Sequence, residues 1–205
     1  MTEKEKMLAG KLYDPTDPEL SALRAEAHRL SQLYNLTLEQ EADKRQELLD
    51  KLLPNRAEGA WLQGPVYFDY GCFTTLGRNF YANFNLTILD SAPVAIGDNV
   101  MLGPNCSILT PVHPLRFEER NMRRKPDGSF FNYEYAKPVA IGANCWLAAN
   151  VTVTGGVTIG EGCVIGAGSV VTRDIPPHSL AAGVPCRVIR EITEADAMPL
   201  PDEAE

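Results

Sequence analysis

Residues 141–171 read IGANCWLAANVTVTGGVTIGEGCVIGAGSVV, and an aliphatic side chain returns every six residues along this stretch. A period of six fits neither an amphipathic helix, which repeats every 3.6 residues, nor a single strand, which repeats every two. It fits short strands and tight turns stacked into a parallel solenoid. The same spacing occurs earlier in the chain. The aliphatic positions are Leu76, Ala82, Ile88, Ile96, Leu102, Ile108, Ile141, Leu147, Val153, Ile159, Ile165 and Val171.

Two further positions of the repeat support a solenoid. The third residue after the aliphatic one is Asn or Gly, and these residues best tolerate the left-handed backbone of a tight turn. The fourth is compact, as expected for a side chain that points inward. We therefore predict a mainly β fold whose coils lie about 4.8 Å apart. The turn residues are Asn99, Asn105, Asn144, Asn150, Gly156, Gly162 and Gly168, and the compact residues are Val100, Cys106, Cys145, Val151, Val157, Cys163 and Ser169.

Length and charge exclude several classes of protein. The 205 residues accommodate one well-buried domain with a short appendage. The net charge is −8, but residues 191–205 hold six acids and no base, so much of that charge lies in a tail. No broad basic face indicates nucleic acid, and no apolar run approaches the roughly 20 residues that cross a bilayer. The first residues lack the apolar core of a signal peptide, which predicts a cytoplasmic protein.

The first 60 residues do not follow the repeat and predict a small helical subdomain. Asp17 is a suitable helix cap with Pro18 in the first turn, and apolar residues then follow at helical spacing to Tyr34. Thr37 with Gln40 resembles a capping box, which predicts a second helix from there to residue 53, before a proline.

None of the five cysteines is predicted to be catalytic. Cys106, Cys145 and Cys163 occupy the compact position, where a thiol packs as a small apolar group. Cys72 and Cys186 lie at the ends of the repeat and are expected to be reduced and inert, and an odd count fits a reducing compartment. No Cys/His cluster has the spacing of a metal site, so we predict no metal.

The repeat is interrupted at residues 110–137, because the 33 residues from Ile108 to Ile141 are not a multiple of six. Loops of this length inside compact proteins are usually functional or mobile. The loop contains His113, which lies between two prolines, and the basic cluster Arg123-Arg124-Lys125. An acceptor, a cofactor and water all remain candidate partners for this cluster.

Residues 66–90 are rich in aromatic and amide side chains, in contrast to the aliphatic repeat. Aromatic walls with a few directed carboxylates and amides suit sugar hydroxyls, which need both stacking faces and polar partners. The alternative is that Asn83 and Asn85 are turn residues and that the aromatic side chains fill a wide first coil. The residues alone leave both interpretations open.

Several longer motifs resemble the maltose and galactoside O-acetyltransferases. The resemblance runs from Lys6 to Arg190 and excludes the acidic tail. It implies an N-terminal helical subdomain (1–60), a left-handed parallel β-helix domain (61–190) with the inserted loop (110–137), and a tail (191–205). It also implies transfer of an acetyl group from acetyl-coenzyme A to a sugar hydroxyl, typically the 6-hydroxyl. The motifs are Asp69-Tyr-Gly, Asn79-Phe-Tyr-Ala-Asn83-Phe-Asn85, Ile96-Gly-Asp-Asn, His113-Pro114 and Ala182-Gly-Val-Pro-Cys-Arg187-Val-Ile-Arg190.

The resemblance implies roles for the residues of the reaction. His113 takes the hydroxyl proton as a general base, and no acyl-enzyme forms. Asn83 lies beside His113 and contacts the acceptor, and a backbone N–H near Ala149 stabilises the oxyanion. Further acceptor contacts fall on Asp69, Asp90 and either Asp14 or Asp17. The coenzyme A contacts fall on Ala149, Ala167, Thr172, Arg173, Arg187 and Arg190, of which the arginines suit its phosphates.

The family assembles as homotrimers with each active site between two subunits, so the resemblance implies that His113 and its loop face a neighbouring subunit. Trp146 interrupts the aliphatic run, which fits either packing between subunits or the capping of a groove. Two departures from the family pattern concern the acceptor. The inserted loop is longer than in the galactoside enzymes, and Ser91 stands where some members have a second acid.

Three alternative functions remain. The first keeps the chemistry but changes the acceptor to an amine, serine, an antibiotic or a lipo-oligosaccharide. The second is a zinc hydro-lyase like the γ-class carbonic anhydrases, which needs several clustered histidines, and His28 and His178 are poorly placed to join His113. The third is a non-catalytic solenoid, which would not need His113 among polar residues.

Overall fold

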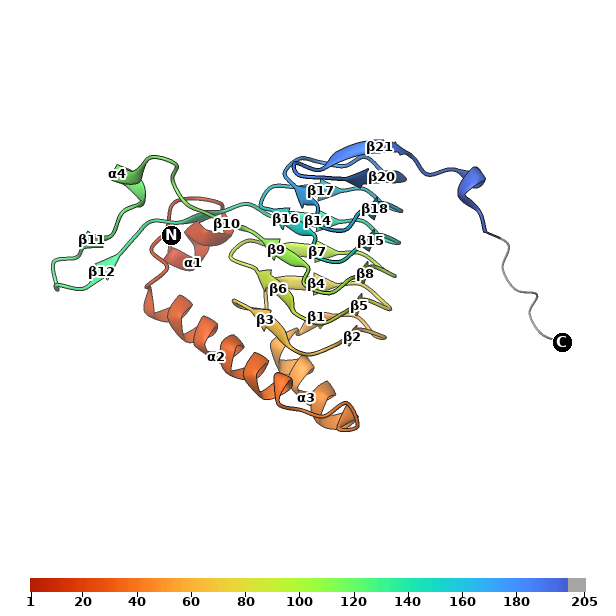
Figure 1. Ribbon diagram of the computed structural model, residues 1–205. Coiled ribbons are helices and arrows are strands. Elements are labelled where there is room, and N and C mark those ends of the chain that lie inside the picture. Colours follow the sequence, from red (N-terminus) through yellow and green to blue (C-terminus); the bar gives the residue numbers. More distant parts are fainter. Residues whose placement is uncertain (199–205) are drawn as a thin grey trace.

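The computed structural model describes residues 1–198 and shows a column of stacked coils with helices packed at its base (Figure 1). The predicted fold, a mainly β parallel β-helix preceded by helices, is confirmed. The part of the acidic tail beyond residue 198 lies outside the described residues. The division of the chain into residues 1–60, 61–190 and 191–205 stays a prediction.

Each regular coil contributes one short strand to each of three parallel sheets. The first sheet contains β1 (Asn55–Arg56), β4 (Thr74–Leu76), β7 (Val94–Ile96), β14 (Val139–Ile141) and β17 (Thr158–Ile159). The second contains β2 (Trp61–Leu62), β5 (Tyr81–Ala82), β8 (Met101–Leu102), β15 (Trp146–Leu147), β18 (Val164–Ile165) and β20 (Ser179–Ala182), with β21 (Arg187–Glu191) added antiparallel to β20. The third contains β3 (Val66–Phe68), β6 (Leu86–Leu89), β9 (Ser107–Leu109), β16 (Thr152–Thr154) and β19 (Val170–Val171).

The six-residue period places the aliphatic side chains inside the column. Ile96 lies in register with Leu76 on one side and with Ile141 on the other, and all three are buried. The compact position is also buried, as Val100 and Cys145 illustrate. One continuous apolar core therefore runs along the axis of the solenoid.

The turns have the predicted backbone conformation. Every Asn of the turn position adopts a positive φ, for example 56° at Asn99 and 61° at Asn144, and the three glycines do the same. The asparagines also connect coils through their side chains. Asn79 Nδ2 donates to Asn99 Oδ1 at 3.0 Å, and Asn99 Nδ2 donates to Asn144 Oδ1 at 3.1 Å. Asn is therefore suited to this position both by its backbone and by its amide.

The longest helix, α2 (Pro18–Asn35), begins as predicted. Asp17 Oδ1 accepts hydrogen bonds from the backbone N–H groups of Glu19 at 3.0 Å and Leu20 at 3.4 Å, which caps the helix. The helix buries Ala27 and Tyr34 against the base of the solenoid, where α2 packs beside β3.

The predicted capping box at Thr37 and Gln40 is wrong. Helix α3 (Ala42–Leu52) begins later, and its cap residue Glu41 makes no side-chain capping bond. The Thr37 hydroxyl instead donates to the carbonyl of Tyr34 at 2.6 Å, so it satisfies the end of α2 rather than the start of α3. A capping box does form at Thr2 and Glu5, where the short helix α1 (Glu3–Leu8) was not predicted.

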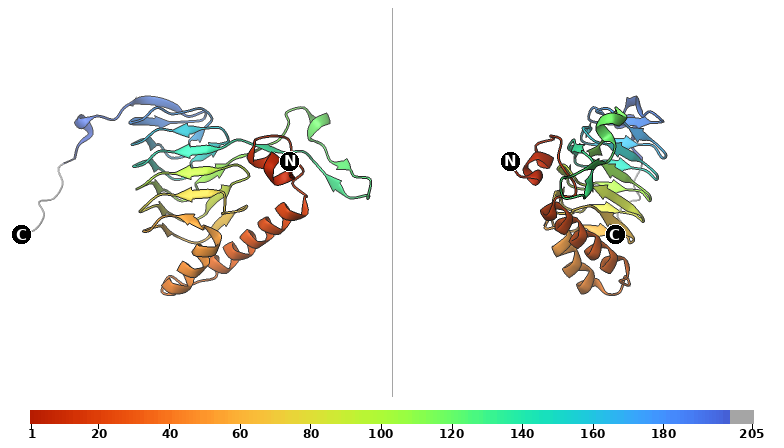
Figure 2. Two further views of the ribbon diagram at one scale, coloured as in Figure 1. Left: turned by 180° about the vertical axis from the view of Figure 1, so that it is seen from behind. Right: turned by 90° about the vertical axis from the view of Figure 1, so that its left-hand side faces the viewer.

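The inserted loop forms an arm that extends away from the solenoid (Figure 1). Its base is a two-stranded ribbon, β10 (Pro111–Val112) with β13 (Tyr135–Ala136). It carries α4 (Phe117–Arg120) and the hairpin β11 (Arg123–Arg124) with β12 (Phe130–Phe131). Figure 2 shows α1 beside the arm. The following segment is attached to it, because Tyr13 donates from its N–H to the Glu134 carbonyl and from its hydroxyl to Glu134 Oε2, both at 2.9 Å.

One further element lies outside the regular coils. A 3-10 turn at Glu194–Asp196 follows β21 at the carboxyl end of the described chain. Within residues 1–198, the helices are all too short or too polar to span a bilayer.

Candidate active site

The predicted site residues lie at two of the three corners of the coil. The Asn83 corner is the turn between the second and third sheets, where Asn83 follows β5. The His113 corner is the turn between the third and first sheets, where the arm leaves after β9. The two corners lie at opposite ends of the strands of the third sheet.

A groove of about 340 Å³ runs along the Asn83 corner and brings together Asn83, Ala149 and Trp146. Asn83 Oδ1 accepts a hydrogen bond from the N–H of Phe84 at 2.8 Å, which leaves Nδ2 as the donor toward a ligand. Ala149 lies beside Gly103, where a Cβ atom would stand only 2.7 Å from the Ala149 nitrogen. The absence of a side chain at Gly103 therefore lets the two coils pack closely at this point. Trp146, which is 48% exposed, forms part of the groove wall.

The predicted coenzyme A residues divide between the corners. Ala167 lies one coil beyond Ala149 at the Asn83 corner, since the Ala149 carbonyl accepts a hydrogen bond from Gly168 N–H at 2.9 Å. Arg187 is paired with Ala182 at the same end of the second sheet. Thr172 and Arg173 instead follow β19, at the His113 corner. One chain therefore does not bring all six residues together.

Arg190 lies farther along β21, opposite Leu180. Its Nη1 donates to Asp196 Oδ2 at 2.7 Å, and its Nη2 lies 2.5 Å from Asp196 Oδ1. The guanidinium is thus held by the chain's own carboxylate in a two-pronged ion pair, which is the geometry that arginine also offers to phosphate.

His113 is exposed at the base of the arm. Its Nδ1 lies 3.4 Å from the carbonyl oxygen of Tyr133 and 3.5 Å from Nδ2 of Asn132. The pairing of Val112 with Tyr135 fixes the two strands from which these residues come. A proton on Nδ1 that faces the Tyr133 carbonyl leaves Nε2 as the ring atom able to accept a proton.

The two candidate acids near the amino terminus have different surroundings. Asp17 is occupied by capping α2. Asp14 forms an ion pair with Lys125 of the arm and accepts hydrogen bonds from the N–H and hydroxyl of Thr16 at 2.8 and 2.7 Å. Burial opposes ionisation of Asp14, but the hydrogen bonds from Lys125 and Thr16 outweigh it and lower its pKa. The structure therefore brings Asp14, and not Asp17, to the arm that carries His113.

The basic cluster of the arm is partly accounted for by these contacts. Lys125 pairs with Asp14 and also donates to the Thr16 hydroxyl at 2.9 Å. Arg123 donates to the backbone carbonyl of Glu118 at 3.0 Å and lies over the Tyr133 ring. These two cations hold the arm in its observed shape.

Asp90 is completely buried behind the His113 corner. Its Oδ1 accepts from the N–H groups of Tyr70 and Gly71 at 2.8 and 3.1 Å, and its Oδ2 accepts from Phe73 N–H and the Thr74 hydroxyl at 3.2 and 3.0 Å. Burial raises the pKa of Asp90 although these donors oppose the rise. A carboxylate occupied by four protein donors holds the turn at residues 70–74 and has little capacity left for an acceptor.

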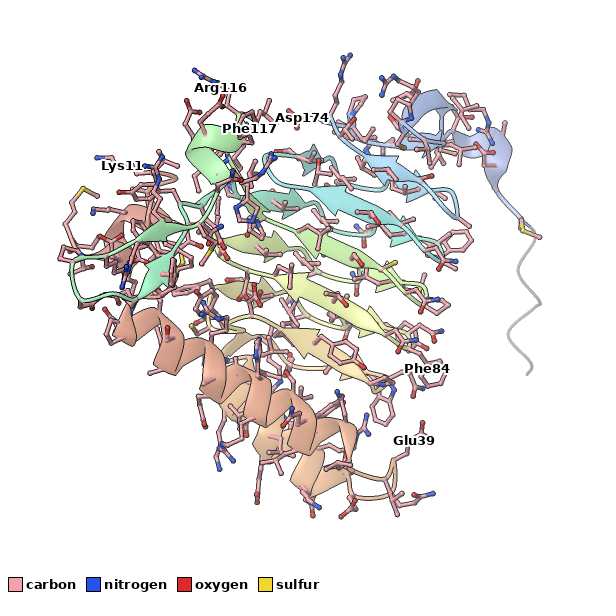
Figure 3. All side chains as sticks on the ribbon, turned by 60° about the vertical axis from the view of Figure 1, so that its left-hand side comes forward. Lys11, Glu39, Phe84, Arg116, Phe117 and Asp174 are labelled. Atoms are coloured by element: carbon pink, nitrogen blue, oxygen red, sulfur yellow. The ribbon has the colours of Figure 1, made fainter. Side chains whose placement is uncertain are left out.

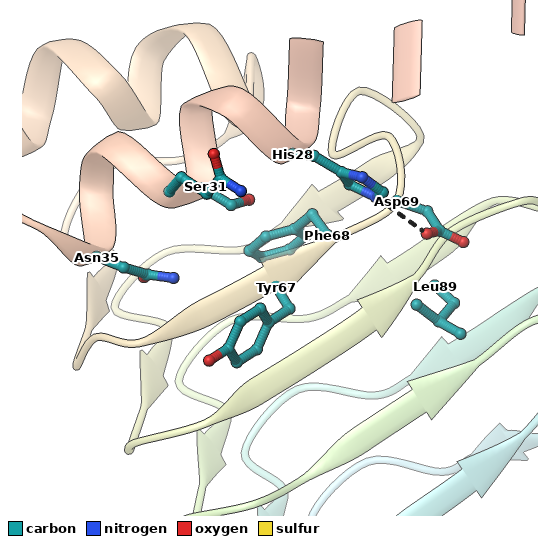
Figure 4. Close-up of a pocket in the computed structure, with 8 residues that line it drawn as sticks. His28, Ser31, Asn35, Tyr67, Phe68, Asp69 and Leu89 are labelled. Atoms are coloured by element: carbon teal, nitrogen blue, oxygen red, sulfur yellow. Dashed lines mark ion pairs between the residues drawn. The ribbon is translucent and has the colours of Figure 1, made fainter. Parts of the chain in front are cut away.

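Asp69 lies one residue beyond β3 and is more accessible than Asp90. Its Oδ1 lies 3.5 Å from Nε2 of His28 on α2. Burial raises the pKa of Asp69, and the neighbouring His28 reduces that rise. The two residues line one cavity between helix and strand (Figure 4). His28 was not among the predicted site residues. His28 shares a helix face with Ser31 and Asn35, which follow it by three and seven residues and line the same cavity, and no apolar pattern in the sequence marked that face.

Asn83 and His113 are not brought together within one chain. The strands of the third sheet begin at the Asn83 corner and end at the corner that carries the arm. The two corners are therefore separated by the length of one strand with its flanking residues, which is about 15–20 Å for five or six extended residues. Figure 3 shows Phe84, the neighbour of Asn83, on the far side of the solenoid from Arg116 and Phe117 of the arm. A base and an acceptor contact must approach the same substrate within hydrogen-bond reach, so this distance is too large for one site.

The part of the chain that the structure describes contains no group of three or more His, Cys, Asp or Glu side chains arranged to hold a metal ion. All five cysteines are unpaired, and four of them are buried.

Three family models match this chain. The maltose acetyltransferase hexapeptide capping motif matches residues 6–55, and the bacterial transferase hexapeptide (six repeats) matches residues 138–173. The hexapeptide repeat of succinyl-transferase matches residues 93–113. Together with the three-sheet coil, these matches define a transferase of the hexapeptide-repeat class.

Similar proteins narrow the class. The chain is 43% identical to the galactoside O-acetyltransferase of Escherichia coli (strain K12) over 196 residues, which cover 96% of this chain and 92% of that protein. A structure of galactoside acetyltransferase in complex with coenzyme A superposes with a TM-score of 0.88 and 42% identity, covering 98% and 97% of the two chains. A maltose O-acetyltransferase from Clostridium difficile 630 gives a TM-score of 0.80 and 44% identity, with 95% and 99% covered. The chain belongs to the maltose and galactoside O-acetyltransferase family.

Proposed function

We propose that this protein is an acetyl-coenzyme A-dependent O-acetyltransferase that acetylates a sugar, at the 6-hydroxyl of maltose, glucose or a galactoside. Family membership supports the reaction class, since the similar proteins are galactoside and maltose acetyltransferases and one was solved with coenzyme A. The five unpaired cysteines agree with action in the reducing cytoplasm.

His113 acts as the general base in this proposal. Acetyl-coenzyme A supplies the acetyl group as a thioester. Nε2 of His113 takes the proton of the acceptor hydroxyl, and the Tyr133 carbonyl, 3.4 Å from Nδ1, supports the tautomer in which Nε2 is free. The imidazolium then returns the proton to the leaving sulfur. No cysteine is needed as a nucleophile.

The groove at the Asn83 corner supplies the other polar groups. The backbone N–H of Ala149, which lines this groove, stabilises the negative charge that develops on the carbonyl oxygen. Asn83 contacts the acceptor through Nδ2. Ala167, Thr172, Arg173, Arg187 and Arg190 are proposed to bind coenzyme A, and the arginines suit its phosphates.

Asp14 and Asp69 are the acids that the geometry favours as acceptor contacts. Both carboxylates lie at the His113 corner and keep some exposure, with 16% and 22% of their side chains accessible. Asp17 and Asp90 are less suitable, because the first caps α2 and the second is enclosed by four donors.

The separation of Asn83 from His113 is the observation that carries the proposed assembly. Two groups at opposite ends of the strands of one sheet act on one substrate only if a second copy supplies one of them. In a cyclic trimer, the His113 corner of each subunit meets the Asn83 corner of the next, and every site is completed once. The exposed apolar side chains of the arm, which include Leu115 at 90% and Phe117 at 60%, support its contact with a neighbouring subunit.

Mixing two inactive variants tests both the chemistry and the assembly. His113→Ala and Asn83→Ala are each expected to lower kcat at least about a hundredfold with acetyl-coenzyme A and maltose. When equal amounts are unfolded and refolded together, a site shared between subunits is intact in about one case in four, because each neighbour is drawn independently. Recovery of about a quarter of wild-type activity is expected. No recovery would place the site within one chain and contradict the proposal.

The acceptor is tested separately. Release of free thiol from acetyl-coenzyme A is measured with glucose, maltose and galactosides, and with serine, amines and an aminoglycoside as the alternative acceptors. Acetylation of the sugars alone supports the proposal, whereas preference for an amine would overturn it in favour of N-acetyl transfer.

A further inference from the structure

The cavity between α2 and β3 has a volume of about 250 Å³ and lies at the base of the His113 corner (Figure 4). The proposed transfer uses only Asp69 of its lining. His28 and Ser31 reach it from α2, while Tyr67 and Leu89 reach it from the adjoining strands. These side chains come from two parts of the chain that are packed together, so the cavity is a built feature of the fold.

The polar groups of the cavity are incompletely used by the protein. The Ser31 hydroxyl has no hydrogen-bond partner within residues 1–198, but its oxygen is enclosed by the protein and is not within reach of a ligand in the cavity. Asp69 has a single ionic contact, at 3.5 Å to His28, and its carboxylate can accept further bonds from a ligand.

The apolar side of the cavity has an aromatic face. Tyr67 is 49% exposed although it stands on a strand beside the core, and its register partner on the following coil is Thr87. Leu89 lies two residues beyond Thr87, on the same face of that strand. An aromatic face beside a carboxylate is the combination that recognises a sugar ring, which has apolar C–H faces and polar edges.

The position of the cavity relates it to the transfer site. Asp69, Leu89 and Leu109 occupy successive coils at the ends of β3, β6 and β9. Coils are about 4.8 Å apart, so the cavity lies about 5–10 Å below the point where the arm leaves. His113 follows four residues beyond Leu109. A ring whose hydroxyl reaches His113 would place an adjoining ring over the cavity.

We propose that this cavity is a second acceptor subsite that binds the sugar ring next to the acetylated one, so that the enzyme prefers disaccharides to free monosaccharides. The proposal rests on the proposed function, because it extends the acceptor site of that reaction. Tyr67 stacks on the second ring, the Asp69 carboxylate accepts hydrogen bonds from its hydroxyls, and His28 is a positioning residue that orients this carboxylate.

Equilibrium binding tests the subsite without requiring turnover. The His113→Ala protein is titrated with maltose, glucose and methyl α-glucoside by calorimetry. The methyl glucoside has the same reacting ring and anomeric substitution as maltose but lacks the second ring. Maltose is expected to bind about tenfold more tightly than glucose or methyl α-glucoside, because its second ring stacks on Tyr67 and forms hydrogen bonds in the cavity. Adding Tyr67→Ala should remove this preference and leave glucose binding within twofold. Adding His28→Ala should also reduce the preference, through the loss of the contact that orients Asp69.

Arg29→Ala is the matched control, because Arg29 lies on the same helix, is exposed and pairs only with Glu26. It should leave all three affinities unchanged. Equal binding of the three sugars, or a maltose preference that survives both cavity variants, would overturn the subsite. Intact maltose preference in a wild-type protein that transfers no acetyl group would instead contradict the proposed function and leave the subsite standing.

Discussion

The guanidinium of Arg190 and the carboxylate of Asp196 form a two-pronged ion pair at 2.7 and 2.5 Å, across a turn of the carboxyl-terminal segment. The hydrogen bonds from Arg190, together with one from Thr193 N–H, lower the pKa of Asp196 to about 2. A lowered carboxyl pKa means that the pair is intact above the ordinary pKa of Asp and is lost only as the pH falls toward 2. In a neutral assay, a phosphate that binds Arg190 through the same two nitrogens therefore competes with Asp196.

Asp196→Asn is accordingly expected to lower KM for acetyl-coenzyme A by about two- to fivefold, the range that an exposed ion pair represents. Arg190→Gln should raise KM instead. Glu194→Gln removes an acid from the same turn without touching Arg190 and should leave KM unchanged. If neither Arg190→Gln nor Asp196→Asn alters KM, Arg190 does not contact the cofactor.

Asp90→Asn should destabilise the fold rather than change acceptor affinity. In the better of its two orientations, the Asn amide keeps its oxygen on the N–H groups of Tyr70 and Gly71, and its NH₂ donates to the Thr74 hydroxyl, which can rotate to accept. The NH₂ then faces the fixed N–H of Phe73, and one buried donor without an acceptor costs about 1–3 kcal/mol. Thermal unfolding at fixed protein concentration measures the loss.

The control for Asp90 is Asp43→Asn, an exposed acid in the first turn of α3, which should cost no more than about 0.5 kcal/mol. A stable Asp90→Asn protein with a raised KM for sugar would show that Asp90 contacts the acceptor after all.

The coil was predictable because its signal is repeated and local. Each unit carries an inward aliphatic residue and a residue able to adopt positive φ, and Ile96 and Asn99 show both in the structure. The helix starts were less predictable. The pattern of a capping box is the same at Thr2 and Thr37, but Thr37 lies close enough to the end of α2 to bond the Tyr34 carbonyl. A four-residue pattern does not reveal which helix end will use the hydroxyl.

The sequence predicted candidate site residues but not how they are arranged in space. Whether a corner residue points outward depends on the turn around it, and Asp90 points inward while Asp69 does not. The cavity at His28 depends on how α2 packs across β3, a contact between distant parts of the chain that no local pattern contains. The spacing of the repeat does, however, assign Asn83 and His113 to different corners once the order of the three sheets is known.

The cysteines are expected to resist alkylation in the native protein. Burial raises the pKa of Cys106 and of Cys145 to about 11, so at pH 8 only about one molecule in a thousand carries either thiolate. Burial also raises the pKa of Cys163 and Cys186. Cys72 is half-buried and should react first with iodoacetamide, as mass spectrometry of the labelled peptides would show.

Incubation with acetyl-coenzyme A should likewise leave no acetyl adduct on any of these thiols. Unfolding in urea is the control, since all five cysteines should then be labelled. An acetylated cysteine in the native enzyme would contradict transfer without an acyl-enzyme, and rapid labelling of Cys106 or Cys145 would contradict the suppression of their thiolates by burial.

Gly97→Ala should destabilise the solenoid through contact between neighbouring coils. Gly97 follows the inward Ile96, and a Cβ atom there would stand 2.5 Å from the backbone nitrogen of Ala143 on the next coil. Backbone cannot yield as a flexible side chain does, so the coils must separate locally, at a cost of roughly 3 kcal/mol.

Gly168→Ala is the matched comparison, because Gly168 has a φ of +72° but open space around its Cβ position. Backbone strain alone should cost about 1 kcal/mol there. Thermal melting at one protein concentration ranks the two variants, and a Gly97→Ala protein at least as stable as Gly168→Ala would refute close coil contact as the reason for glycine after the aliphatic residue.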